Sequence, residues 1–165
     1  MTDLAAAPPS ILRPNIGWPA LAAVAVLAGA ALHHPPKLEL IAAAATPIRI
    51  HLAAAVATFL LGVVLMLGAK GNLAHRALGW TWAATMAVTA VSSLFIQEIR
   101  SGGFSFIHAF SGWVIVALPA ALYAARAHKV RIHRRMMTGM YVGGMFLAGG
   151  FAFLPGRLMY AVFFG

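Results

Sequence analysis

Long apolar runs dominate this chain and most constrain what it can fold into. Five of them cover approximately residues 17–34, 48–67, 78–96, 106–125 and 136–155. Each is long enough to cross a hydrocarbon layer of roughly 30 Å at about 1.5 Å per helical residue. We therefore predict an all-α polytopic membrane helical bundle with five transmembrane helices, forming one integral-membrane domain over residues 1–165. The first run is short and alanine-rich, like a signal peptide, but we expect it to be retained.

Composition supports the membrane prediction and excludes several kinds of site. The chain is 62% hydrophobic and only 9% charged, far less charged than a soluble domain of 165 residues. It has no cysteine, which rules out disulfides, thiolate metal sites, iron–sulfur clusters and a cysteine nucleophile. Its net charge of +9 comes from basic residues in short connections beside apolar runs. Such residues contact lipid phosphate, so we expect no nucleic-acid binding.

The distribution of lysine and arginine predicts the orientation. With the N-terminus in the cytoplasm, the inner side holds the larger basic set: Arg13, Lys70, Arg76, Arg126, Lys129, Arg131, Arg134 and Arg135. The outer side then holds Lys37, Arg49, Arg100 and Arg157. Because cytoplasmic loops carry the excess of positive charge, this count favours an inner-membrane protein with a cytoplasmic N-terminus and an external C-terminus, with the connection 127–135 as the strongest signal.

A histidine pattern occurs twice, at matching positions in successive runs. In each copy Ile-His near the start of one run is followed about two dozen residues later by His-Arg near the start of the next: Ile50-His51 with His75-Arg76, and Ile107-His108 with His133-Arg134. Two hairpins of the same sense are related by a pseudo-two-fold axis along the membrane normal. The repeat therefore predicts two histidine pairs, His51 with His108 at the outer face and His75 with His133 at the inner face.

The chemistry open to these pairs is narrowed by the scarcity of carboxylates. The three acidic residues, Asp3, Glu39 and Glu98, all lie outside the well-buried parts of the predicted spans. A carboxylate dyad, an acidic proton relay and a carboxylate-rich metal centre therefore lack their parts, and no catalytic residue is predicted. Neutral imidazole remains, which binds haem iron axially and also binds zinc or copper.

Bis-histidine haem ligation needs two imidazoles on facing helices and room for a flat macrocycle between them. One turn beyond the four histidines stand Ala55, Gly79, Gly112 and Met137, of which three are small. Arg76 and Arg134 follow the inner pair and can hydrogen-bond haem propionates. The structural alternative is that interfacial histidines bind no ligand and that the arginines beside them reach lipid phosphate.

Local signals predict where the helices begin and how closely they approach one another. Thr46-Pro47 resembles an N-cap followed by proline at the first helical position, and Asn72 is expected to cap the third span. Gly139 and Gly143 form a small-xxx-small pair that is expected to admit another helix or a flat ligand. Pro155-Gly156 is expected to end or kink the fifth span. The residues after it, 158–165, are too few to cross again.

Several motifs resemble a known family. They are the run His133-Arg134-Arg135-Met136-Met137-x-Gly139-x-Tyr141-x-Gly143-Gly144 with its continuation to Arg157, together with His75-Arg76-x-Leu78-Gly79-Trp80 and Ser105-Phe106-Ile107-His108. From about residue 47 onward the chain is similar to a bacterial family of predicted membrane proteins of the DUF2306 type, a domain of unknown function. That resemblance implies a multi-span bacterial inner-membrane protein and supplies no activity.

In architecture the chain also resembles the di-haem ascorbate-reducing b cytochromes. In those proteins histidines of the second and fourth spans hold one haem, and histidines of the third and fifth hold the other. The order of spans here matches, although residues of a recognisable ascorbate site are missing, so no electron donor is indicated.

These observations predict a small b-type haem protein that transfers electrons across or within the inner membrane. Its cofactor-binding residues would be His51, His108, His75 and His133, with Arg76 and Arg134 beside the inner haem. The alternative is a non-catalytic accessory subunit or assembly factor of a larger respiratory or photosynthetic membrane complex. A weaker possibility is a quinone- or lipid-binding protein that uses the arginine clusters.

Overall fold

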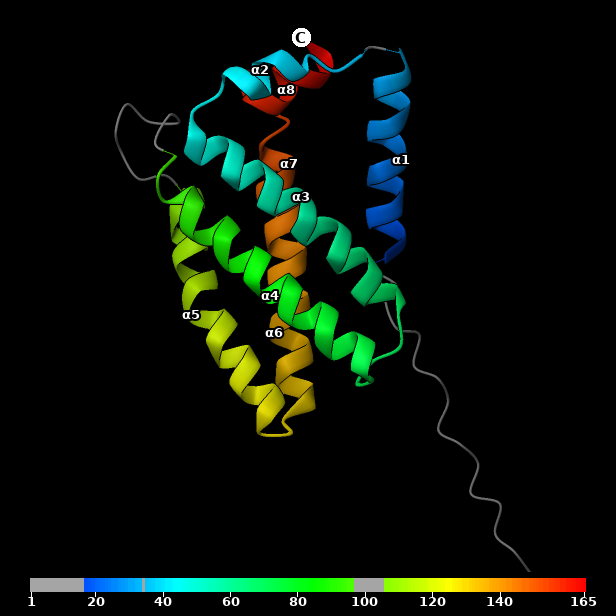
Figure 1. Ribbon diagram of the computed structural model, residues 1–165, viewed down its shortest axis with the longest axis vertical. Coiled ribbons are helices and arrows are strands. Elements are labelled where there is room, and N and C mark those ends of the chain that lie inside the picture. The colour runs from blue at the N-terminus through cyan, green and yellow to red at the C-terminus, as the bar shows by residue number, and fades with distance from the viewer. Residues whose placement is uncertain (1–16, 34, 97–105) are drawn as a thin grey trace, which may run out of the picture.

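The computed structural model describes residues 17–33, 35–96 and 106–165, and the described chain is helical with no β-strand (Figure 1). The helices are α1 Gly17–His33, α2 Leu38–Ala43, α3 Thr46–Leu67, α4 Leu73–Ser93, α5 Phe106–Arg126, α6 Val130–Val142, the π-helical segment η1 Gly143–Ala148, α7 Gly149–Phe151 and α8 Leu158–Phe164. The all-α prediction is confirmed for these residues. Five residues named in the sequence analysis lie outside the described ranges: Asp3, Arg13, Glu98, Arg100 and Ser105.

The first hairpin pairs α3 with α4, which contact each other along their length. A short turn joins them, and polar groups close both helix ends there. The ammonium group of Lys70 donates to carbonyl oxygens at the C-terminus of α3, those of Leu65, Met66 and Gly68. The Asn72 side chain accepts a 2.8 Å hydrogen bond from the backbone N–H of His75, so the predicted N-cap of α4 is confirmed.

The second hairpin pairs α5 with α6. Their connection spans only residues 127–129, with His128 at a positive φ of 56°. Helix then runs from Val130 through the π segment to Phe151 without a break, because the residues at both junctions keep right-handed helical backbone angles. The basic residues Arg131, Arg134 and Arg135 therefore lie in the first turns of α6, and the prediction of a loop over 127–135 is wrong for them.

The four long segments form a closed bundle. Neighbouring contacts run from α3 to α4, from α4 to α5 and from α5 to α6. Tyr141 of α6 closes the ring: its buried side chain lies against Gly62, its hydroxyl donates to the Phe59 carbonyl at 3.3 Å, and the two aromatic rings stack. Buried Trp82, Met86 and Met140 fill the interior around it.

The remaining helices lie outside this bundle. α1 runs beside α3, which it contacts, with many of its apolar side chains exposed. At the end of the bundle shown at the top of Figure 1, α2 and α8 pack against each other, and the Lys37 backbone N–H donates to the Val162 carbonyl at 2.9 Å. The C-terminus lies at this end.

Among the described residues, two helices are long and apolar enough to cross a membrane, α3 and residues 107–126 of α5, so the prediction of five transmembrane helices is not confirmed. These two helices match the predicted spans 48–67 and 106–125 closely. The predicted run 17–34 coincides with α1, and the predicted runs 78–96 and 136–155 correspond to helical stretches with shifted bounds. Because Asn72 starts α4, this helix begins five residues before the predicted 78 and ends at Ser93, and the fifth helical stretch begins at Val130 and ends at Phe151.

Three local predictions need correction. Ala45, not Thr46, occupies the N-cap of α3, and the Thr46 hydroxyl instead accepts from the Arg49 guanidinium at 3.3 Å. The last long helix ends before Pro155-Gly156, where Gly156 turns the chain at a φ of +81°. Of the glycine pair, only Gly143 admits a neighbour, the Phe110 ring, whereas Gly139 is exposed.

Candidate functional site

His51 lies in the second turn of α3 and is fixed to the C-terminal end of α4. Its Nδ1 atom is 2.9 Å from the Thr89 carbonyl oxygen and 3.2 Å from the Ser92 hydroxyl. The Ser92 hydroxyl donates to the Val88 carbonyl at 2.6 Å, which leaves its oxygen to accept from the imidazole. A backbone carbonyl can only accept, so Nδ1 of His51 carries the proton and Nε2 carries the lone pair.

His108 lies near the start of α5, at the same end of α4. Its side chain is 5% exposed, the most buried of the four histidines. Ser111, three residues further along α5, hydrogen-bonds to Ser93 of α4 with 2.5 Å between the two oxygens. The last turns of α4 thus contact the region of His51 on one side and that of His108 on the other. The prediction that His51 and His108 share one end of the bundle agrees with these contacts.

The second pair, His75 and His133, lies at the opposite end. His133 of α6 has its Nδ1 atom 2.9 Å from the Ala121 carbonyl oxygen of α5, so Nδ1 carries a proton here too, and the lone pair of the neutral ring is on Nε2. His75 lies in the first turn of α4 and His133 in the first turns of α6, and both helices begin at the same end of the bundle (Figure 1). The structure therefore brings His75 and His133 into the same region, as the repeat predicts.

The two pairs occupy diagonal positions in the bundle. The order of neighbours around it is α3, α4, α5 and α6, closed by Tyr141 on α3. His51 and His108 therefore belong to opposite helices, α3 and α5, and His75 and His133 to the other opposite helices, α4 and α6. Diagonal helices flank the axis of a bundle, where cofactors of such proteins are bound.

Space beside two of the histidines is open. A Cβ atom built on Gly79 or on Gly112 meets no described atom within 4 Å, although both glycines are half-buried. Each stands one turn beyond a histidine, Gly79 beyond His75 and Gly112 beyond His108. Arg76 and Arg134 are both exposed, at the end of the bundle that holds His75 and His133.

Other polar groups near the pairs carry no clear sequence signal. The Nδ1 atom of His75 and the Nε1 atom of Trp82 are buried and accept or donate no hydrogen bond within the described chain. They stand seven residues, about two turns, apart on α4. The hydroxyls of Ser92, Ser93 and Ser111 were not predicted as part of the site. Their only indication is that serines at the end of an apolar run must find hydrogen-bond partners inside the bundle.

The arrangement provides pairs of imidazoles and no larger cluster. Within the described ranges, no group of three or more histidine, aspartate or glutamate side chains is close enough to hold a metal ion. Of the two pockets described, one lies on the outer surface between α3 and α4 and the other between α5 and the π segment, and neither is lined by a histidine of the two pairs.

Comparisons with known proteins found no match for this chain. No family model matches the chain, and no curated protein or solved structure matches it. The family resemblance stays a prediction, and the functional argument depends on the geometry of the histidines.

Proposed function

We propose that this chain is a small multi-pass inner-membrane protein that binds haem b at one or both histidine pairs and conducts electrons within or across the membrane. α3 and α5 would be two of its spans, and α1, α4 and the continuous segment from α6 to α7 would be the others. The ligands would be His51 and His108 at the outer end and His75 and His133 at the inner end.

The observation that carries this proposal is the hydrogen bonding of Nδ1 in one histidine of each pair. His51 donates to the Thr89 carbonyl and His133 to the Ala121 carbonyl. Histidines that bind metals almost always donate their other ring N–H to a carbonyl, carboxylate or water, which fixes the tautomer and ring orientation. An imidazole held in this way presents Nε2, the atom that ligates haem iron.

The surroundings of the pairs fit a flat, largely apolar ligand. Opposite helices supply the two imidazoles of each pair, and the half-buried glycines Gly79 and Gly112 leave open space one turn away. The exposed guanidinium groups of Arg76 and Arg134 stand at the inner end, where they can hydrogen-bond carboxylates. Haem, when bound, supplies one-electron chemistry, and the chain supplies ligands, orientation and a dry interior.

Haem content of the purified protein tests the proposal. The protein is produced in haem-replete cells, and a reduced-minus-oxidised spectrum and a pyridine haemochrome assay are recorded. We expect non-covalent haem b, because the chain has no Cys-x-x-Cys-His attachment motif. Colourless protein would overturn the proposal and leave the accessory-subunit or assembly-factor alternative.

Single and double replacements test the pairing. His51→Ala and His108→Ala should remove the same haem, and the double variant should lose little more, because two ligands of one iron act as a unit. His128→Asn is the matched control, since His128 is exposed in the α5–α6 connection at a positive φ that asparagine tolerates. Loss of haem from the control as well would show that the pairs are not specific ligands.

A further inference from the structure

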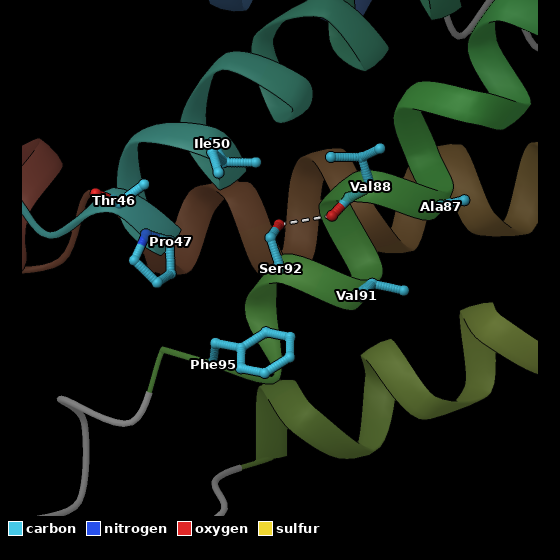
Figure 2. Close-up of a pocket in the computed structure, with 8 residues that line it drawn as sticks. All are labelled: Thr46, Pro47, Ile50, Ala87, Val88, Val91, Ser92 and Phe95. Atoms are coloured by element: carbon cyan, nitrogen blue, oxygen red, sulfur yellow. Dashed lines mark hydrogen bonds between the residues drawn. The ribbon is translucent and has the colours of Figure 1, made fainter.

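A shallow groove on the outside of the bundle lies between the first turns of α3 and the last turns of α4 (Figure 2). Its volume is about 520 Å³, within the roughly 300–1,000 Å³ typical of small-molecule sites. α3 contributes Thr46, Pro47 and Ile50. The facing turns of α4 contribute Ala87, Val88, Val91 and Ser92. Phe95, just beyond the end of α4, completes the lining.

The walls of the groove are apolar and open to the surroundings. Phe95 is 69% exposed, Ile50 is 49% exposed and Val91 is 47% exposed. The Ser92 hydroxyl is turned to the backbone, where it donates to Val88, as Figure 2 shows. Leaving such a surface in water is unfavourable by roughly 25 cal/mol per Å² of apolar area. A hydrocarbon chain is the ligand that this lining recognises.

A positive charge stands at one rim of the groove. Arg49, on the first turn of α3, is exposed, and its guanidinium group donates to the hydroxyl of Thr46, a residue of the groove lining. This hydrogen bond holds the guanidinium beside the groove. Arginine binds phosphate through its planar fork of N–H donors, which gives the groove a charged end and an apolar body.

We propose that this groove binds an anionic phospholipid, with one acyl chain along α3 and α4 and the phosphate on Arg49. The charge complementarity of Arg49 selects the phospholipid over a neutral alkyl or isoprenoid chain. The site depends on the membrane placement of α3 but not on haem, so failure of haem binding leaves it intact.

Native mass spectrometry of the full chain, delipidated in detergent and titrated with phosphatidylglycerol or phosphatidylcholine of the same acyl composition, tests this site. We expect phosphatidylglycerol to bind about tenfold more tightly, because its phosphate charge is uncompensated, whereas the choline ammonium of phosphatidylcholine offsets the attraction of its phosphate to Arg49. Arg49→Gln should bring its affinity down to that of phosphatidylcholine. Val88→Trp places a large side chain in the groove from an exposed position and should weaken the binding of both lipids.

Two control variants separate this site from general lipid adhesion. Lys37→Gln removes an exposed charge outside the groove, and Val56→Trp adds the same bulk to an exposed position of α3 outside it. Both should bind like the parent chain. Equal affinity for the two lipids would overturn the selection of an anionic headgroup by Arg49, and unchanged lipid binding in Val88→Trp would overturn the groove as the binding site. Displacement of phosphatidylglycerol by decylubiquinone that persists in Arg49→Gln would assign the groove to a quinone and overturn the proposal.

Discussion

Tyr141 determines how closely α6 approaches α3. Its ring is fully buried, stacks with Phe59 and meets Phe146 edge-on, with centroids 6.4 Å apart in both pairs. The ring also occupies the space that a side chain at position 62 would need. Glycine at that position thus lets an aromatic residue join two helices that share few other contacts, and Tyr141 is what makes the four segments a closed bundle.

Gly62→Ala should destabilise the protein although alanine is the better helix former. A Cβ at this position overlaps the Tyr141 ring, and such overpacking typically costs about 1–3 kcal/mol. The gain in helix propensity, about 1 kcal/mol, offsets only part of that cost. Thermal unfolding in detergent measures the difference.

Gly79→Ala is the matched control, because a Cβ there meets no described atom. It should leave the unfolding temperature unchanged or raise it. If Gly62→Ala were as stable as Gly79→Ala, the closure of the bundle by Tyr141 would be wrong.

The imidazoles show where sequence reasoning reaches its limit at the residue scale. Their grouping at two ends follows from the repeat of Ile-His and His-Arg, because equal spacing in two hairpins puts equivalent residues at equivalent levels. Their hydrogen-bond partners, the Thr89 and Ala121 carbonyls, are main-chain atoms on neighbouring helices. Every residue has such a carbonyl, so no pattern in the sequence marks these two.

At the scale of helices, the length of an apolar run predicts that a helix exists better than it predicts the residues at which the helix begins and ends. The bounds of α3 and α5 agree with the predicted spans because their apolar runs begin and end with the helices. α4 and α6 begin before their apolar runs, since Asn72 caps α4 and the exposed residues Arg131, Arg134 and Arg135 are already helical. The π segment after Val142 was not predicted, because one extra residue in a turn leaves little trace in hydropathy.

Asn72→Ala tests the cap of α4. The Asn72 side chain accepts from the backbone N–H of His75, which otherwise lacks an intrahelical partner. Losing an N-cap costs about 1 kcal/mol, within a range of roughly 0.5–2. We expect a lower unfolding temperature for Asn72→Ala, measured by circular dichroism in detergent.

Asn72→Asp keeps the capping oxygen and serves as the control, since aspartate caps as well as asparagine. Its stability should match that of the parent chain. Equal stability of the alanine variant would mean that water replaces the cap without loss.

At the scale of the whole molecule, the outer surface of the bundle is apolar along the two candidate spans. On α3, Val56, Leu60 and Val64 are each at least half exposed, and on α5 Val116 is 72% exposed. Exposing this apolar surface to water costs free energy, whereas contact with lipid chains does not. The basic side chains lie at the two ends of the bundle instead. The end formed by the two hairpin connections holds Lys70, Arg76, Arg126, Lys129, Arg131, Arg134 and Arg135.

That asymmetry predicts the orientation of the molecule. The opposite end holds only Lys37, Arg49 and Arg157 among the described basic residues, and it also holds the C-terminus. Because the more basic side stays in the cytoplasm, the hairpin connections should be inside and Gly165 outside. An alkaline phosphatase fused after Gly165 should be active, and a green fluorescent protein fused there should be dark. The reverse pattern would exchange the two membrane faces, moving His51 and His108 to the cytoplasmic side and His75 and His133 to the outer side, while leaving the pairs themselves unchanged.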